Sequence, residues 1–175
     1  MEEKLKKIRA FASDVDGVLT DGTLICTTEG DLLRQYSAKD GFGLRMAYMN
    51  GYGLAIITGG WSQTIVKRLV SSGVKEEDFY LRSRDKVADF YAYCSRKGYK
   101  PEEVMYFGDD LPDIPVMQVA GVSVCPADAV EEVKAVADCV SDREGGNGCV
   151  REYVEKVMKL RGDWIFDVGC YKKEF

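Results

Sequence analysis

Two groups of carboxylates each follow directly on an apolar run that is typical of a buried β-strand. Asp14 and Asp16 come after the first run, and Asp109 and Asp110 come after the run at residues 104–107. Ligands of open α/β sheets bind beyond the carboxyl ends of the strands, so both groups are expected at one edge of a sheet. Like charges are costly to bury there unless a cation offsets them. A bound Mg²⁺ would do so, because it takes oxygen ligands and leaves positions for a substrate phosphate.

Two further segments favour an anion site at the same edge. Thr58 and Gly59 follow the apolar run at residues 54–57 and would place a hydroxyl and flexible backbone amides there. Lys86 falls in the first turn of an expected helix, where the helix dipole disfavours a cation unless an anion lies close by. Each segment alone is more often a turn or a surface group. Their order, each after a strand, makes the set far more specific.

Short apolar runs alternate with helical patterns along the chain, which predicts β-α-β units and a parallel sheet. The expected strands cover residues 8–12, 54–57, 104–107 and 122–125, with a weaker run at 79–81. Helix-capping residues predict helices over 62–72, from 83 or 85 to 97, over 129–137 after Asp128, and from 147 or 148 to 159. We therefore expect a Rossmann-like, doubly wound three-layer α/β/α fold in one domain over residues 1–162.

Two segments depart from this alternation. Between Asp21 and Asp40, two strand-like runs flank a glycine-containing turn, which predicts a β-hairpin flap over about residues 22–37. The tail over residues 163–175 is too apolar for a free chain end. We expect it to dock on its own chain or on a neighbouring copy.

The composition excludes several functional classes. The 175 residues contain 24 Lys and Arg against 29 Asp and Glu, which argues against a nucleic-acid partner. There is no histidine, so histidine-based triads and histidine-ligated zinc or haem sites are excluded. The six cysteines form no C-x-x-C pair, the first residues are charged, and no apolar run suits a membrane span. These features predict a cytoplasmic protein with a small-molecule partner and no membrane contact.

The motifs together resemble the haloacid dehalogenase superfamily, whose signature is Asp-x-Asp-x-[Thr/Val], then Ser or Thr, then Lys, then Gly-Asp-Asp-x-x-Asp. The matching residues are Asp14-Val15-Asp16-Gly17-Val18, Thr58, Lys86 and Gly108-Asp109-Asp110-Leu111-Pro112-Asp113. Further runs, at residues 40–45 and 145–152, are similar to the branch that contains the 3-deoxy-D-manno-octulosonate 8-phosphate phosphatases. This likeness covers about residues 8–157. The chain intervals on either side of Thr58 are too short for a cap domain.

The resemblance implies roles for the acidic residues. Asp14 would be the nucleophile that forms an aspartyl-phosphate. Asp16 would be the general acid for the leaving sugar oxygen and then the general base for the hydrolytic water. Mg²⁺ would be held by the carboxylates of Asp14 and Asp109 and by the backbone carbonyl of Asp16.

The resemblance also implies which residues bind and support the phosphate. Thr58, Gly59 and Lys86 would hold its oxygens, where charge sits in the transition state. Asp113 would orient Lys86, and Asp110 is a further supporting candidate near the metal. A calcium-binding EF-hand loop around Asp14 is excluded, because the apolar Val18 stands where a third oxygen ligand would be needed.

The resemblance implies hydrolysis of 3-deoxy-D-manno-octulosonate 8-phosphate in lipopolysaccharide biosynthesis, by a homotetramer in which a neighbour's hairpin and tail cover the site. Two alternatives stay open: a 2-keto-3-deoxynonulosonate or N-acylneuraminate 9-phosphate as substrate, and a catalytically silent binding module. Gly60 departs from the pattern, because many octulosonate 8-phosphate phosphatases carry arginine there. The candidate partners of the substrate carboxylate are Arg68, Arg82, Arg84 and Lys67.

Overall fold

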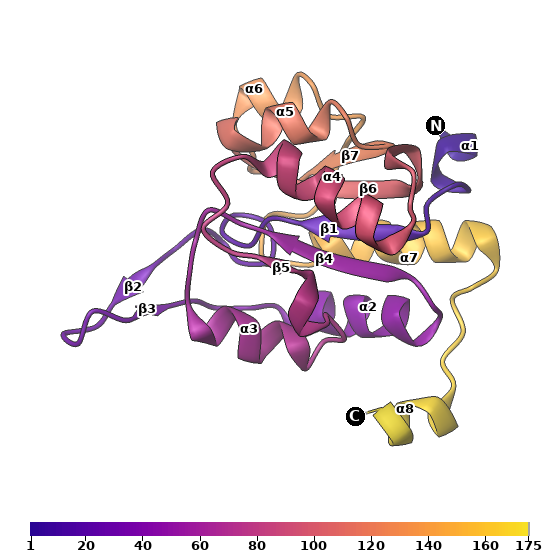
Figure 1. The fold of residues 1–175 in the computed structure, drawn as a ribbon, viewed down its shortest axis with the longest axis horizontal. Helices are drawn as coiled ribbons and strands as arrows, with labels where there is room; N and C mark the ends of the chain where they lie inside the picture. Colours follow the sequence, from indigo (N-terminus) through magenta and orange to yellow (C-terminus); the bar gives the residue numbers. More distant parts are fainter. Residues whose placement is uncertain (175) are drawn as a thin grey trace.

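A six-stranded parallel sheet forms the centre of the fold in the computed structural model, which describes residues 1–174 (Figure 1). The strands lie in the order β5-β4-β1-β6-β7-β8. Their bounds are β1 Ala10–Ser13, β4 Gly53–Ile57, β5 Phe79–Tyr80, β6 Val104–Phe107, β7 Val122–Cys125 and β8 Cys139–Val140. The expected α/β class and all five expected strands are confirmed, and β8 is an additional edge strand.

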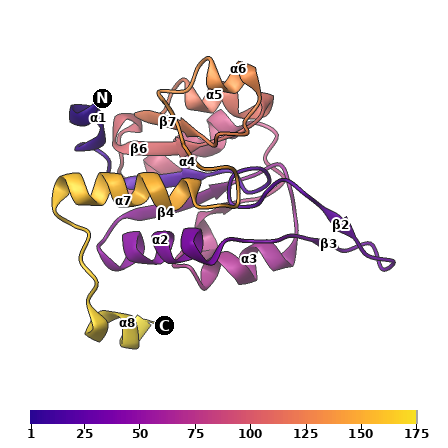
Figure 2. The same ribbon diagram turned by 180° about the vertical axis from the view of Figure 1, so that it is seen from behind.

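Helices cover both faces of this sheet (Figures 1 and 2). One face carries α1 (Glu2–Leu5), α2 (Ala38–Met49), α3 (Gln63–Val70) and α7 (Cys149–Arg161). The other carries α4 (Lys86–Lys97), α5 (Ile114–Met117) and α6 (Glu131–Lys134). Short 3₁₀ turns, η1 (Glu76–Asp78), η2 (Pro101–Glu103) and η3 (Leu111–Asp113), lead into strands or helices. No helix among the described residues has both the length and the apolar character to span a membrane.

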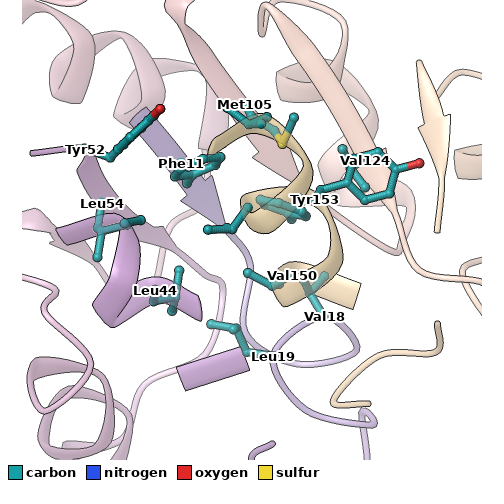
Figure 3. Close-up of a cluster of buried hydrophobic side chains, with 14 of the residues drawn as sticks. Phe11, Val18, Leu19, Leu44, Tyr52, Leu54, Met105, Val124, Val150 and Tyr153 are labelled. Carbon is teal, nitrogen blue, oxygen red and sulfur yellow. The ribbon is translucent and has the colours of Figure 1, made fainter. Parts of the chain in front are cut away.

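Alternate strand residues supply the two cores. Phe11 packs with Tyr52, Leu54 and Val150 in the cluster beneath α2 and α7 (Figure 3). Ala12, its neighbour on β1, lies in the cluster on the α4 side. Burial on both faces explains why these strands appear in the sequence as continuous apolar runs.

The expected helix ends are mostly confirmed. Ser62 and Asp85 cap α3 and α4 by accepting backbone N–H bonds, and Gly98 ends α4 with a positive φ. The helix expected over 129–137 was wrong, because α6 covers only Glu131–Lys134. The carboxylate of Asp128 instead accepts a hydrogen bond from the backbone N of Gly145 at 2.9 Å, so it does not cap a helix.

Helix α2 is an element that the sequence pattern did not indicate. Gly41 and Gly43 interrupt it, and glycine costs about 1 kcal/mol per helical position relative to alanine. The packing explains one of them: a Cβ on Gly43 would lie 2.9 Å from the Cδ of Arg151 on α7. Asp40 on α2 also accepts backbone N–H bonds from Gly148 and Arg151, at 2.9 and 2.8 Å. Contacts with α7 therefore stabilise a helix that local propensity disfavours.

The expected hairpin is present as the antiparallel pair β2 (Ile25–Cys26) and β3 (Leu32–Leu33), which extends away from the sheet (Figure 1). The rest of the interval between Asp21 and Thr58 holds α2 and β4. The interval from Thr58 to Lys86 holds α3, η1 and β5, so no cap domain is inserted in either described interval.

The tail docks on its own chain and ends in α8 (Val168–Glu174); Phe175 lies outside the described residues. The hydroxyl of Tyr52 donates to Asp163 at 2.7 Å. The ring of Phe42 on α2 lies 5.9 Å from that of Phe166, centroid to centroid. The tail therefore packs against α2, which lies on the side of the sheet opposite α4 (Figures 1 and 2).

Candidate active site

The ends of three adjacent strands bring the predicted site residues together. Asp14 follows β1, Thr58 follows β4 and Asp109 follows β6, and β1 pairs with both other strands. They border a cavity of about 760 Å³. The predicted residues that line it are Asp14, Asp16, Thr58, Gly59, Lys86, Asp109, Asp110 and Asp113.

Lys86 is the buried centre of this cluster. Its ammonium donates to Oδ2 of Asp14 and to Oδ1 of Asp113, both at 2.6 Å, and its side chain is only 7% exposed. Burial by itself would lower the pKa of Lys86, but the two carboxylates outweigh it and raise the pKa above its usual value. Lys86 is therefore held as a cation although it opens a helix. The expected anion beside it is present.

Asp113 is fully buried and bound on every side. Its Oδ1 also accepts from the hydroxyl of Tyr106 at 2.7 Å, and its Oδ2 accepts from the backbone N of Asp109 at 3.2 Å and of Asp110 at 3.4 Å. Sequence reasoning missed Tyr106, because it looks like one more core residue of an apolar strand. With these bonds made, Asp113 is suited to fix Lys86.

Asp109 is the least satisfied acidic group of the site. Its Oδ1 is buried and has no hydrogen-bond partner among the described residues. Burial, and then the carboxylates of Asp113 and Asp14, raise the pKa of Asp109 to about 8. A Cβ on Gly17, which has a φ of +84°, would collide with the Asp109 carboxylate. The absence of a side chain at Gly17 thus leaves room for the Asp109 carboxylate.

The acidic cluster fits a divalent cation. Carboxylate oxygens of Asp14, Asp109 and Asp113 all lie within 4.8 Å of one another. Burial and the carboxylate of Asp113 also raise the pKa of Asp14, against the opposing effect of Lys86. Both oxygens of Asp14 and of Asp113 already accept hydrogen bonds, whereas Oδ1 of Asp109 has no partner among the described residues. This buried, unpartnered carboxylate oxygen is the observation that best fits a bound Mg²⁺.

Arg34 reaches the site from the hairpin, and sequence reasoning missed it. Its guanidinium donates two hydrogen bonds to the carboxylate of Asp16, from Nε at 2.6 Å and from Nη2 at 3.0 Å. The sequence offers only a weak indication that Arg34 belongs to the site. It is a cation two residues before Tyr36, in a segment that otherwise has the pattern of a strand.

Comparison with known proteins now identifies the family. Residues 60–152, more than half of the chain, match the family described as haloacid dehalogenase-like hydrolases. The chain belongs to this family. The predicted resemblance is thereby confirmed.

Individual relatives of this haloacid dehalogenase-like chain agree over nearly its whole length. It is 35% identical over 159 residues to the 3-deoxy-D-manno-octulosonate 8-phosphate phosphatase KdsC of Salmonella typhi, covering 91% of this chain and 84% of the relative. A subfamily III A hydrolase of the superfamily from Legionella pneumophila superposes with a TM-score of 0.92 at 33% identity, over 98% and 93% of the two chains. The 3-deoxy-D-manno-octulosonate 8-phosphate phosphatase of Moraxella catarrhalis, solved with magnesium ion, phosphate ion and KDO, gives 0.89 at 33% identity, over 93% and 92%.

The four candidate partners of a substrate carboxylate differ in where they lie relative to the haloacid dehalogenase-like site. Arg84 lines the cavity. Arg82, with a φ of +54°, places its guanidinium 4.7 Å from the ring centre of Trp61. Arg68 donates instead to the hydroxyls of Ser71 and Ser72, and Lys67 is exposed on the surface. Arg84 is thus the candidate that faces the reaction space.

Proposed function

We propose that this protein hydrolyses 3-deoxy-D-manno-octulosonate 8-phosphate to the free sugar acid and phosphate, as a step of lipopolysaccharide biosynthesis. The observation that carries the proposal is the buried pairing of Asp14 with Lys86 in a carboxylate-lined cavity. It occurs in a chain that resembles phosphatases of this substrate over most of its length. The Moraxella relative binds the magnesium ion, phosphate and sugar acid that such a reaction involves.

In the first step, Asp14 attacks phosphorus. A carboxylate oxygen of Asp14 forms a bond to the phosphorus atom while the bond from phosphorus to the sugar oxygen breaks, which gives an aspartyl-phosphate. Asp16 donates a proton to the departing oxygen. The ammonium of Lys86, the hydroxyl of Thr58 and the backbone amide of Gly59 hold the other phosphate oxygens as their charge develops.

In the second step, water releases the phosphate. Asp16, now a carboxylate, takes a proton from the water that attacks phosphorus, and the bond from phosphorus to Asp14 breaks. Asp14 returns as a carboxylate beside Lys86. Acid and base are the same group, so the absence of histidine leaves the cycle complete.

The same geometry supports a magnesium cofactor. Asp14, Asp109 and the backbone carbonyl of Asp16 would hold the ion. When bound, Mg²⁺ neutralises charge and so lets an anionic nucleophile approach an anionic phosphate. Asp113 would keep Lys86 in place. Asp110, which accepts from the backbone N of Leu111 at 2.7 Å, would fix the turn that carries Asp113.

Arg84 supports a sugar acid as the substrate. Among the described residues that line the cavity, Arg84 and Lys86 are the cations, and Lys86 is already paired. Arg84 is exposed and forms no ion pair with any described residue. A guanidinium suits bidentate binding of a carboxylate. We therefore assign Arg84 the substrate carboxylate.

The hairpin supports an assembly, which we propose to be a homotetramer that works in the cytoplasm. Leu24, Ile25 and Leu33 are exposed, Ile25 by 62%. A two-stranded hairpin with strands of two residues is marginally stable alone, because it buries little apolar surface. Hairpins from neighbouring copies would cover these side chains and the open side of the cavity.

The deciding experiment is steady-state phosphate release with Mg²⁺ from octulosonate 8-phosphate and from deoxynonulosonate 9-phosphate. A hundredfold preference for the first in kcat/KM, about 2.7 kcal/mol, is expected. Comparable or reversed values would move the enzyme to the nonulosonate 9-phosphates. Asp14→Asn, or removal of Mg²⁺ by a chelator, should abolish release. Activity that survives both would contradict the mechanism, and a wild type without activity on either substrate would favour the silent binding module.

A further inference from the structure

The contact between Arg34 and Asp16 attaches the hairpin to the catalytic edge of the sheet. The two hydrogen bonds, at 2.6 and 3.0 Å, use both carboxylate oxygens of Asp16. Only 1% of the Arg34 side chain is exposed, whereas the tip of the hairpin lies largely in solvent. Paired and buried arginine forks fix direction as well as charge, because both donors lie in one plane.

The surroundings of the pair leave little freedom to the guanidinium. Its third bond, from Nη1, goes to the backbone oxygen of Leu32 at 3.2 Å, within the hairpin itself. A Cβ on Gly60 would lie 3.3 Å from Nη2 of Arg34 and 3.3 Å from Oδ2 of Asp16. The same Cβ would lie 3.5 Å from the hydroxyl of Thr58. The pair therefore lies next to the phosphate-binding threonine, in a space that the glycine leaves open.

We propose that Arg34 is a positioning residue for Asp16, which couples the placement of the hairpin to proton transfer at the leaving group. This inference rests on the role of Asp16 in the proposed function. The Asp16 side chain is 28% exposed, and each of its oxygens keeps a second lone pair. Arg34 thus fixes where the carboxyl group lies and leaves one side of it open to the cavity.

The size of the effect follows from what misplacement costs. A catalytic group displaced by about 1 Å can lose about 10²-fold in rate. Arg34 donates a hydrogen bond to each carboxylate oxygen of Asp16. Without these two bonds, the Asp16 side chain would be free to adopt other rotamers. Lysine at position 34 would restore the charge but not the fork, because an ammonium is a point donor.

The test compares two leaving groups. A sugar oxygen must be protonated as it departs, whereas p-nitrophenolate departs as a stable anion, so Asp16 matters much less for p-nitrophenyl phosphate. We expect Arg34→Ala to lower kcat/KM for octulosonate 8-phosphate by about 10²-fold, and for p-nitrophenyl phosphate by less than about threefold. The value of kcat/KM reports only on the steps up to departure of the leaving group. Hydrolysis of the aspartyl-phosphate, which follows, therefore does not affect the comparison of the two substrates. Arg34→Lys should recover part of the loss.

Two controls make the result decisive. Arg9→Ala removes an arginine from the opposite end of β1, where it faces Glu103, and should leave both values unchanged. In an Asp16→Asn background, Arg34→Ala should add no further loss for the sugar phosphate, because it acts through Asp16. An equal fall on both substrates, or a full additional loss in the Asp16→Asn background, would overturn the proposal. If Asp16→Asn itself does not discriminate between the substrates, the proposed role of Asp16 fails instead.

Discussion

The strand ends around Lys86 and the hairpin around Ile25 meet at Asp16. They differ in how far their side chains are buried and bonded within the chain. Lys86, Asp113 and Tyr106 are buried and bonded to one another within one chain. The hairpin has two-residue strands, and its apolar side chains Leu24, Ile25 and Leu33 are exposed to solvent. The side chain of Arg34, by contrast, is buried against the catalytic edge.

This difference suggests that the strand ends carry the reaction and that the hairpin covers the substrate. Strand ends buried on both faces hold the reacting groups rigidly, and rigid placement is what electrostatic stabilisation of a transition state requires. A hairpin that buries little surface opens at low cost in free energy, which suits a segment that covers and uncovers a substrate. We therefore expect substitutions at the strand ends to change the stability of the chain. Changes in the hairpin and tail should instead affect assembly and coverage of the site.

The largest effect on stability is expected at Lys86. Lys86→Met removes the cation between Asp14 and Asp113 and leaves two buried carboxylates without a partner charge. Breaking a buried ion pair in this way costs about 3–5 kcal/mol of unfolding free energy. Chemical denaturation in the presence of a chelator measures it. Lys67→Met, on the surface of α3, is the matched control and should change the value by less than about 0.5 kcal/mol.

A second variant shows whether the loss comes from unpaired charge. Lys86→Met combined with Asp113→Asn removes one of the two carboxylates. It should regain part of the lost free energy, because the remaining repulsion is smaller. A loss below about 1 kcal/mol in Lys86→Met would contradict the view that the edge depends on this pairing.

The next effect concerns assembly. Ile25→Glu together with Leu33→Glu places charges on the exposed face of the hairpin. We expect the proposed oligomer to dissociate, as measured by sedimentation, because desolvating the new carboxylates opposes contact between copies. The unfolding free energy of the chain itself should change by less than about 1 kcal/mol, since both side chains are already exposed.

The matched control is Thr28→Glu, at the turn between the two strands. It adds one carboxylate, half the charge of the double variant, to the hairpin outside its apolar face, and the mass in solution should stay as it is in the wild type. An unchanged mass in the double variant would show that copies of this chain do not meet through the hairpin.

Sequence reasoning located the strand ends and missed contacts made between distant segments. Asp14, Thr58 and Asp109 were predictable, because each follows an apolar run and parallel strands end at the same edge. Helix α2 was missed, because its stability comes from contact with α7 and its two glycines hide the helical pattern. Arg34 was missed for a related reason: nothing in the local sequence shows where a long side chain at the base of a hairpin ends.

The smallest effect is expected from the tail. Truncation after Gly162 removes the hydrogen bond from Tyr52 to Asp163 and the ring contacts of Phe166 with Phe42. The truncation also removes Trp164, which packs against the core. Because Phe166 is about half exposed and Trp164 is only partly buried, the unfolding free energy should fall by only about 1 kcal/mol. We expect kcat/KM for the sugar phosphate to fall by about tenfold, or about 1.4 kcal/mol, if the tail helps to enclose a site in the assembly.

Phe166→Ser is the informative companion to this truncation, because it weakens the docking of the tail on α2 and keeps its length. If the tail encloses a neighbour's cavity, weaker docking on its own chain leaves kcat/KM near the wild-type value while truncation lowers it. If the docked position seen here is the functional one, both variants lose a little stability, Phe166→Ser less than the truncation, and neither changes kcat/KM. An unchanged kcat/KM after truncation would therefore remove the tail from the catalytic assembly and leave enclosure to the hairpin alone.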